Sequence, residues 1–252
     1  MSVFDELRAA VEGGGRVVVF TVIAGEQVGA KVLVREDGST AGDGPAELAA
    51  LAPAALRKGR SHVLEQEGTT LFADVFAPPP RLLIYGAIDT AEALCRTAKL
   101  LGWTTIVADA RARFATRERI PSADELLVSW PEDALERVQP DLGTAIVVLT
   151  HDDKFDVPML AGALATDAFY VGALGSRRNQ ERRRSLLNEL GVADADLERI
   201  AGPCGLDIGA ESPAETALSM LAEILAARAG RAGGSLKASR QRIHAEPFAG
   251  KK

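Results

Sequence analysis

The sequence predicts an α/β protein in which a small α+β N-terminal domain precedes a larger domain, a parallel sheet with helices on both faces. Residues 81–230 alternate short runs of β-branched residues with helical stretches, which is typical of such a sheet. Residues 1–76 instead contain mostly β-rich runs. Between them, residues 77–80 read Ala-Pro-Pro-Pro, which can neither continue a helix nor donate ladder hydrogen bonds. We therefore place a linker at 77–80.

The N-terminal domain is expected to combine two hairpin-like pairs of β-rich runs with two helices. Turn residues separate the runs, and apolar residues at helical spacing mark the helices. The predicted elements are a helix at 3–11, strands at 16–24 and 29–37, a helix at 45–58 and a hairpin within 61–76.

The larger domain is expected to repeat a strand followed by a connection or a helix. Each strand is a short apolar run that ends at a turn residue or a charged residue. The predicted strands are RLLIYG, TTIVAD, ELLVSW, AIVVLT and AFYVGAL, and the predicted helices are 89–101, 131–138, 153–167 and 177–190.

The last helix has the clearest boundaries. Ser212 and Glu215 form a capping-box pattern, Pro213 occupies the first helical position, and an apolar stripe ends before Gly230. Residues 231–252 are rich in Gly, Ser and Lys/Arg and are predicted to be a basic, flexible tail.

Composition excludes several classes of protein. Of the 252 residues, 47% are hydrophobic and 25% charged, which is typical of soluble globular domains. The apolar runs are far shorter than the roughly 20 residues of a membrane helix. Cys95 and Cys204 have no Cys-x-x-Cys spacing, so we expect no disulfide framework, no metal site and a cytoplasmic location.

The net charge of −6 is unevenly distributed. Residues 231–252 hold six Lys/Arg and one Glu, a net charge of +5, which leaves −11 on residues 1–230. An acidic body opposes binding to phosphate backbones, so we expect no nucleic acid partner.

The first strand and helix of the larger domain have the layout of a dinucleotide-binding, Rossmann-like unit. Gly86 begins the turn, and Asp109 follows 23 residues later at the end of the next strand, where an acidic residue contacts ribose. Ile88 replaces the second glycine of the fingerprint, and Asp89 adds a negative charge. Two alternatives stay open: a structural remnant of a nucleotide fold, or nucleotide binding in altered geometry. Asp109 is equally open to ligand contact or to pairing with Arg111.

His151 and Asp152 follow the strand AIVVLT. The carboxyl edge of an open α/β sheet is where ligand-binding groups gather, so both are candidate site residues. The alternative is that His151 is a packing or capping residue and that Asp152 caps the next helix.

An anion site is predicted where the strand AFYVGAL meets the next helix. Gly175 and Ser176 precede that helix, and Arg177 and Arg178 lie in its first turn. Free backbone N–H groups, the helix dipole and two guanidinium groups suit a phosphate or another oxyanion. Residues 182–184, all arginine, are predicted to be a solvated face balanced by nearby glutamates.

A glycine-dense loop leads into the final helix and can bring backbone close to a ligand. Its candidate site residues are Gly205, Asp207 and Gly209. Cys204 is either an activated thiol or a small packing residue, and Cys95 is predicted to lie in the core.

Five collinear segments resemble the XdhC/CoxI family, the accessory proteins of xanthine dehydrogenase and aerobic carbon monoxide dehydrogenase. These are the strand and turn at 82–91, Asp109, Leu-Thr-His-Asp at 149–152, the Gly-Ser-Arg-Arg segment at 170–178 and Gly-Leu-Asp-Ile-Gly-Ala-Glu-Ser-Pro-Ala-Glu at 205–215. The resemblance implies that the eleven candidate site residues bind molybdenum cofactor and that the chain delivers it to a molybdenum hydroxylase, without turnover of its own. It also implies a homodimer and a cysteine desulfurase partner.

Two segments differ from the family pattern. Family members usually read Gly-x-Gly-His where residues 86–89 read Gly-Ala-Ile-Asp, and Ser-Gly-Gly-Cys-x-Glu where residues 41–47 contain no cysteine. Two further functions are therefore weighed: an NAD(P)-dependent oxidoreductase, which Ile88 disfavours, and an interaction scaffold that binds no ligand.

Overall fold

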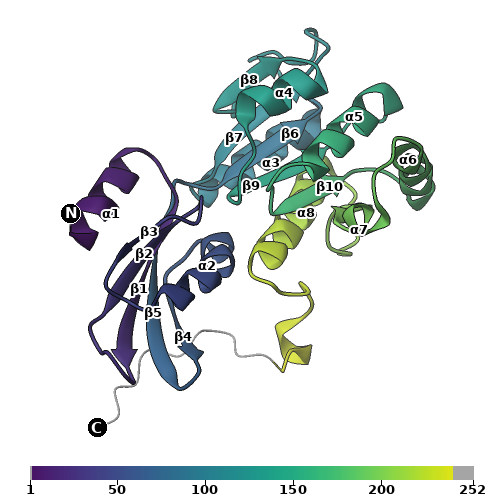
Figure 1. The fold of residues 1–252 in the computed structure, drawn as a ribbon. Coiled ribbons are helices and arrows are strands. Elements are labelled where there is room, and N and C mark those ends of the chain that lie inside the picture. Colours follow the sequence, from purple (N-terminus) through teal and green to yellow (C-terminus); the bar gives the residue numbers. More distant parts are fainter. Residues whose placement is uncertain (1, 241–252) are drawn as a thin grey trace. The chain divides into compact units, whose positions relative to one another are not determined.

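The structure, a computed structural model, describes residues 2–240. It contains two compact units (Figure 1). Within the described residues, one unit consists of residues 2–78 together with 234–240, and the other of Pro79–Gly233. Residues 241–252 of the predicted tail lie outside the described residues.

The first unit is a five-stranded antiparallel sheet in the order β3-β2-β1-β5-β4. Central strand β1 is buried on both sides, because α1 and α2 both contact it, and its run VVVF is accordingly continuous rather than alternating. The elements are α1 (Val3–Glu12), β1 (Val17–Ala24), β2 (Lys31–Arg35), β3 (Thr40–Gly42), η1 (Ala46–Leu51), α2 (Ala52–Lys58), β4 (His62–Gln66) and β5 (Thr69–Phe76).

The predicted helix at 45–58 is in fact two segments, a 3-10 helix followed by α2. Pro53 lies in the first turn of α2 and has no N–H to donate to a preceding turn. Proline is costly inside a helix but well suited to the first turn, so α2 begins here as a separate segment.

The second unit is a six-stranded parallel sheet in the order β11-β10-β9-β6-β7-β8. This is the doubly wound, Rossmann-like order, and the chain reverses direction across the sheet between β6 and β9. The strands are β6 (Arg81–Tyr85), β7 (Thr104–Asp109), β8 (Glu125–Val128), β9 (Thr144–Val148), β10 (Tyr170–Ala173) and β11 (Ile200–Ala201).

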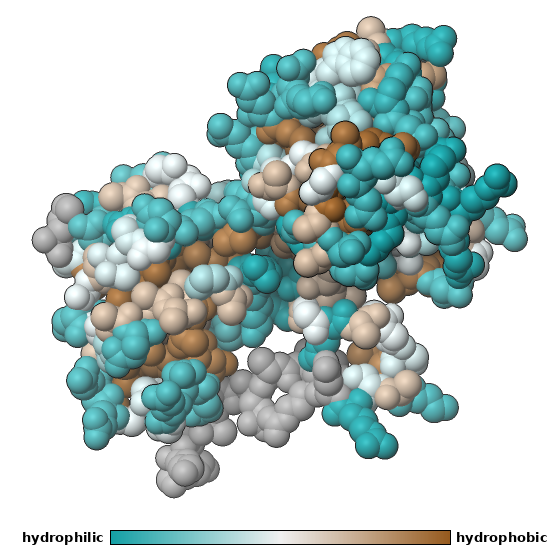
Figure 2. Space-filling model, turned by 45° about the vertical axis from the view of Figure 1, so that its right-hand side comes forward, coloured by the Kyte–Doolittle hydropathy of each residue, from teal (hydrophilic) through white to brown (hydrophobic). Residues whose placement is uncertain are grey.

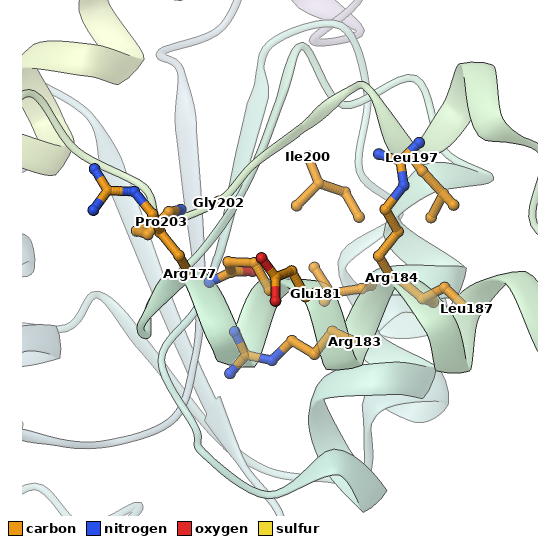
Figure 3. A pocket seen from close by; sticks show the side chains of 11 residues that line it. Arg177, Glu181, Arg183, Arg184, Leu187, Leu197, Ile200, Gly202 and Pro203 are labelled. Atoms are coloured by element: carbon orange, nitrogen blue, oxygen red, sulfur yellow. The ribbon is translucent and has the colours of Figure 1, made fainter.

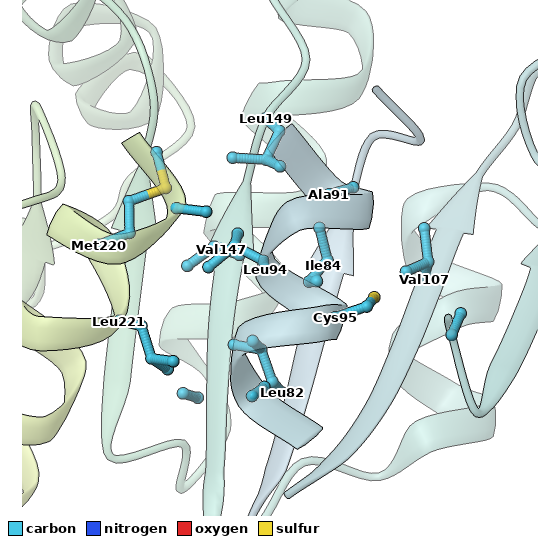
Figure 4. Packing of buried hydrophobic residues seen from close by; sticks show 14 of the residues in the cluster. Leu82, Ile84, Ala91, Leu94, Cys95, Val107, Val147, Leu149, Met220 and Leu221 are labelled. Carbon is cyan, nitrogen blue, oxygen red and sulfur yellow. The ribbon is translucent and has the colours of Figure 1, made fainter. Parts of the chain in front are cut away.

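Helices cover both faces of this sheet, as predicted. Successive strand residues point to opposite faces. Leu82 and Ile84 pack beneath α3 and α8 (Figure 4), whereas Leu83 and Tyr85 belong to the core on the other side. The helices are α3 (Asp89–Leu100), α4 (Pro131–Val138), α5 (Asp153–Leu164), α6 (Arg177–Glu189), α7 (Asp194–Leu197) and α8 (Pro213–Arg228).

The predicted capping box of the last helix is confirmed. The Ser212 side chain accepts a hydrogen bond from the Glu215 N–H at 3.2 Å, and the Glu215 carboxylate accepts one from the Ser212 N–H at 2.8 Å. Cys95 is buried in the cluster beneath α3, also as predicted.

The surface carries several exposed hydrophobic side chains, including Leu100 of α3 and Leu218 of α8. On the face drawn in Figure 2, hydrophilic residues cover most of the surface and hydrophobic residues form separate patches. Among residues 2–240, none of the helices is both long enough and apolar enough to span a bilayer.

Candidate functional site

The loops that carry the candidate residues begin at one level of the sheet. Tyr85, Val148 and Ala173, the last residues of β6, β9 and β10, are in register across these neighbouring parallel strands. The three following loops therefore leave the sheet at the same carboxyl edge, on and beside the point where the strand order reverses. Open α/β sheets bind their ligands at this edge.

Gly86 makes the tight turn that the sequence predicts. Its φ is +116°, and a Cβ atom there would lie 3.0 Å from the backbone nitrogen of Thr150. The first turn therefore runs directly against the end of β9, which only glycine permits.

Asp109 is fully occupied by contacts within the protein. One carboxylate oxygen accepts from the Ala87 N–H at 2.9 Å, and the pair of oxygens accepts from the backbone and side chain of Arg111. Burial alone would raise the pKa of Asp109, but the hydrogen bonds from Arg111 and Ala87 outweigh it and hold the pKa below its ordinary value. Asp109 thus joins the end of β7 to the first turn.

Ile88 and Asp89 give the first turn a different character from a nucleotide loop. Ile88 occupies the N-cap of α3 without a side-chain hydrogen bond and packs against the α3/α8 core. Asp89 is 86% exposed and lies 3.7 Å from Arg119. The start of α3 therefore already has a carboxylate, which disfavours an added anion.

His151 and Asp152 lie between β9 and α5, and both are exposed. Asp152 is the N-cap of α5: its carboxylate accepts from the Lys154 N–H at 3.2 Å, and the Lys154 ammonium lies 3.5 Å away. The capping role that the sequence left open for Asp152 is thus present.

The start of α6 presents donors to solvent. Gly175, with φ +129°, turns the chain, and the Ser176 hydroxyl caps the helix by accepting from the Asn179 N–H at 3.3 Å. Arg177 and Arg178 are exposed, and neither guanidinium has an ion-pair partner among residues 2–240. The first turns of α3, α4, α5, α7 and α8 all contain an acidic residue, whereas that of α6 contains none.

Arg183 does not belong to a solvated face, and this prediction was wrong. Arg182 and Arg184 are partly exposed and paired with acidic residues, but Arg183 is only 1% exposed. Its guanidinium pairs with the buried carboxylate of Asp156 on α5. The reason is helical spacing: Arg183 lies one turn before the buried Leu187 and so shares its inward face.

The same guanidinium fixes two of the loops at the carboxyl edge. It donates to the carbonyl oxygens of Leu174 at 2.6 Å and of Thr150 at 3.1 Å, and the Thr150 hydroxyl donates to Asp156. The loops after β9 and β10 are therefore held together from below by one buried cation.

The loop before α8 divides into a packed part and an exposed part. Gly205, with φ +116°, donates its N–H to Glu223 at 2.8 Å, and Glu223 also accepts from Tyr170. Asp207 and Gly209 are exposed. The packed half anchors the loop on α8, and the exposed half extends into solvent.

Cys204 is a packing residue in this arrangement. Its N–H donates to the Ala173 carbonyl at 3.1 Å, which continues the edge of the sheet. Burial, reinforced by the charge of Glu223, raises the pKa of the Cys204 thiol to about 12. An activated thiol requires the opposite shift.

A cavity of about 350 Å³ runs along α6 (Figure 3). The α6 side chains that line it recur at helical spacing, and α7, β11 and the segment after it form the facing wall. Prominent lining residues are Arg177, Gln180, Glu181, Arg183, Arg184, Leu197, Ile200 and Pro203. Of the eleven residues predicted for the site, Arg177 lines this cavity, and the other ten do not.

Sequence reasoning missed Thr150, Asp156 and Arg183, which position the loops. One signal was available: Asp156 lies between Phe155 and Val157 in an apolar stretch of α5, and a carboxylate in such a place requires a buried cation. Within residues 2–240, no group of three or more His, Cys, Asp or Glu side chains is arranged to hold a metal ion.

The fold is that of a Rossmann-type domain, and the first turn of α6, after β10, carries two arginines that have no ion-pair partner among residues 2–240. Residues 82–224 match the XdhC Rossmann domain, and the chain belongs to the XdhC family.

Two curated proteins and a solved structure are similar to this chain. The chain is 32% identical to a protein of Bacillus subtilis named as a probable subunit of xanthine dehydrogenase, over 64% of this chain and 46% of that protein. It is 31% identical to the molybdenum cofactor insertion chaperone PaoD of Escherichia coli, over 61% and 42%. The chain thus spans less than half the length of these relatives. A solved xanthine dehydrogenase structure from Bacillus halodurans shares the fold, with a TM-score of 0.62 and 23% identity over 88% of this chain and 65% of that one.

Proposed function

We propose that this chain binds molybdenum cofactor and assists its insertion into a molybdenum hydroxylase, as an accessory protein without turnover of its own. The observation that carries the proposal is the start of α6. Arg177 and Arg178 stand there without an acidic neighbour in the first turn and without an ion-pair partner in the described part of the chain. The relatives of this chain include a protein named as a molybdenum cofactor insertion chaperone. This relationship supports molybdenum cofactor as the anionic ligand of the two arginines.

The residues at this helix start suit the phosphate of a pterin cofactor. The first backbone N–H groups of a helix have no partner within it, and the helix dipole favours an anion there. The Ser176 hydroxyl can donate while its oxygen accepts from Asn179. Cations at a helix start oppose the dipole, so a bound anion gives Arg177 and Arg178 a reason to be there. Exposed His151, Asp152, Asp207 and Gly209 would border the bound group.

Co-purification tests the proposal. The full chain, expressed in a host that makes molybdenum cofactor, should release a fluorescent oxidised pterin on acid treatment, in an amount close to one per chain. The double variant Arg177→Ala/Arg178→Ala should lose most of it with little loss of fold stability, because exposed arginines contribute little packing.

A matched control removes two exposed arginines elsewhere, by Arg57→Ala/Arg96→Ala on α2 and α3. It makes the same change in net charge but leaves the start of α6 intact, so the pterin content should stay at the wild-type level. A wild-type chain that carries no pterin would overturn the proposed function. If both double variants lose the same amount of pterin, the loss is a general effect of net charge, and the α6 anion site is contradicted.

The two other functions lack an observation in their favour. An NAD(P)-dependent oxidoreductase needs an acidic residue free to accept from ribose hydroxyls, but Ala87 and Arg111 already occupy both oxygens of Asp109. Titration with NAD or NADP should therefore leave the thermal midpoint unchanged. A ligand that did bind, at 100 times its dissociation constant, would raise the free energy of unfolding by about 2.7 kcal/mol. An interaction scaffold would bind neither NAD(P) nor pterin. The homodimer, the cysteine desulfurase partner and the cytoplasmic location rest on the sequence alone and stay predictions.

A further inference from the structure

The cavity along α6 is lined by both hydrocarbon and charged side chains. Leu160, Leu187 and Ile200 supply hydrocarbon surface, whereas Arg177 and Glu181 supply charged groups. Its volume of about 350 Å³ lies within the range of small-molecule sites, roughly 300–1,000 Å³. Such a lining suits a flat ring that has a polar edge.

Glu181 is a carboxylate without a partner beside this cavity. No hydrogen bond or ion pair reaches its side-chain oxygens from residues 2–240, although arginines lie on the same helix face one turn before and nearly one turn after it (Figure 3). Of those two arginines, Arg184 is engaged by Asp194 and Glu198. An exposed carboxylate does not by itself indicate a binding site, but Glu181 borders a cavity.

The buried Arg183 forms part of the wall of the same cavity. Arg183 is 1% exposed, and its Nε–H is a buried donor that finds no acceptor among the described residues. That Nε–H is closed off from the cavity, and the rest of the guanidinium is directed at Leu174, Thr150 and Asp156. Arg183 thus supplies part of the cavity wall, and Glu181 is the acceptor without a partner that borders the cavity.

From these groups we infer that the cavity holds the pterin ring of the cofactor, with Glu181 recognising its 2-amino-4-oxopyrimidine edge. That edge presents two parallel N–H donors, the 2-amino group and N3–H, which a carboxylate accepts together in a charge-assisted pair. The inference rests on the proposed function and assigns it a specificity residue.

The length of α6 allows one ligand to reach both places. Arg177 and Arg184 are separated by about 10 Å along the helix axis, at 1.5 Å per residue. A phosphate at residues 176–178 and a ring over residues 181–187 therefore fit a pterin with a short phosphate arm. Arg177 belongs to both the anion site and the cavity, which makes them continuous.

The test uses a fluorescent probe, neopterin monophosphate, and its analogue with a 2-oxo group in place of the 2-amino group. Anisotropy titrations of the full chain should show tighter binding of the 2-amino compound. Glu181→Gln should weaken that binding about 10-fold or more, because a charge-assisted hydrogen bond contributes about 1.5–3 kcal/mol, and should abolish the preference over the 2-oxo analogue. Glu189→Gln, an exposed glutamate of α6 that does not line the cavity, should leave both unchanged.

The pterin content of the purified Glu181→Gln chain is a second readout, expected to fall well below that of wild type. If this variant keeps the wild-type content and the wild-type preference for the 2-amino probe, the pterin assignment of the cavity is wrong while the proposed function stands. If the wild-type chain itself carries no pterin and binds neither probe, both fall. Glu181 is exposed, so its replacement should not affect folding, and an unchanged thermal midpoint verifies this.

Discussion

The guanidinium of Arg183 on α6 is paired with the carboxylate of Asp156 on α5, and both side chains are buried. The pair also reaches backbone or hydroxyl groups at Thr150 and Leu174, where β9 and β10 end. A charge pair that is removed from water needs further hydrogen bonds, and here Leu174 and Thr150 supply them to the terminal nitrogens of the guanidinium, although its Nε–H has no acceptor among the described residues. The pair therefore fixes the loops on which any ligand at this edge depends.

Breaking this pair from one side should be strongly destabilising. Arg183→Met leaves the Asp156 carboxylate buried without its cation, and we expect a loss of about 3–5 kcal/mol in the free energy of unfolding. Replacing both, as Arg183→Met/Asp156→Leu, should cost less than the sum of the two single changes. Urea unfolding curves measure all four chains. Arg184→Ala removes a partly exposed pair and should cost about 1 kcal/mol or less, and a loss for Arg183→Met no larger than this would contradict the role of the pair.

Gly86→Ala should destabilise the chain because both backbone conformation and space oppose a side chain there. A Cβ would lie 2.9 Å from Cγ2 and 3.0 Å from N of Thr150, at φ +116°. We expect a loss of at least about 2 kcal/mol, combining backbone strain and overpacking. Gly102→Ala is the control: φ is also positive, +70°, but nothing lies within 4 Å. Chemical denaturation should give that control the smaller loss, about 1 kcal/mol, and equal losses would exclude the close approach to Thr150.

Asp109 should give stability that depends on pH. Because the fold holds the pKa of Asp109 below its ordinary value, the stabilisation is complete above the unfolded-state pKa of about 3.9 and is lost as the pH falls through the lower folded-state pKa. The stability gap between wild type and Asp109→Asn should thus be large at pH 7 and shrink toward pH 3. Asp167→Asn, at an exposed position, should show a small gap at both pH values. A constant gap for Asp109→Asn would refute the linkage.

Much of the fold could be predicted because local signals decide it. The capping box at Ser212 and Glu215 fixes the start of α8. Continuous apolar runs such as AIVVLT indicate strands that are covered on both faces of the sheet. The capping role of Asp152 is likewise local, since it involves the next two residues. Short-range patterns of this kind need no knowledge of the rest of the chain.

The arrangement beneath the site could not be predicted in this way, because its partners come from distant segments. Arg183 looks like the middle of a solvated row of arginines, and its burial depends on Asp156, 27 residues earlier in another helix. The Glu223 carboxylate likewise accepts a hydrogen bond from the Tyr170 hydroxyl, which lies 53 positions away in the sequence. Tertiary contacts override the local pattern at these positions, and the cavity that Arg183 lines was not predicted.

Both cysteines should be unreactive in the folded chain. Burial is the main cause that raises the pKa of Cys95 and of Cys204 to about 12, so at pH 8 both thiols are protonated rather than in the nucleophilic thiolate form. A disulfide reagent such as dithionitrobenzoate should therefore label neither cysteine in native buffer over minutes, and should label two thiols per chain in guanidinium chloride. Cys95→Ala isolates Cys204, which lies in the loop that leads to α8 and is the more revealing of the two. Rapid native labelling of that variant would mean that the loop opens or that the thiol is activated, and Cys204 would return as a candidate reactive group beside Gly205 and Asp207.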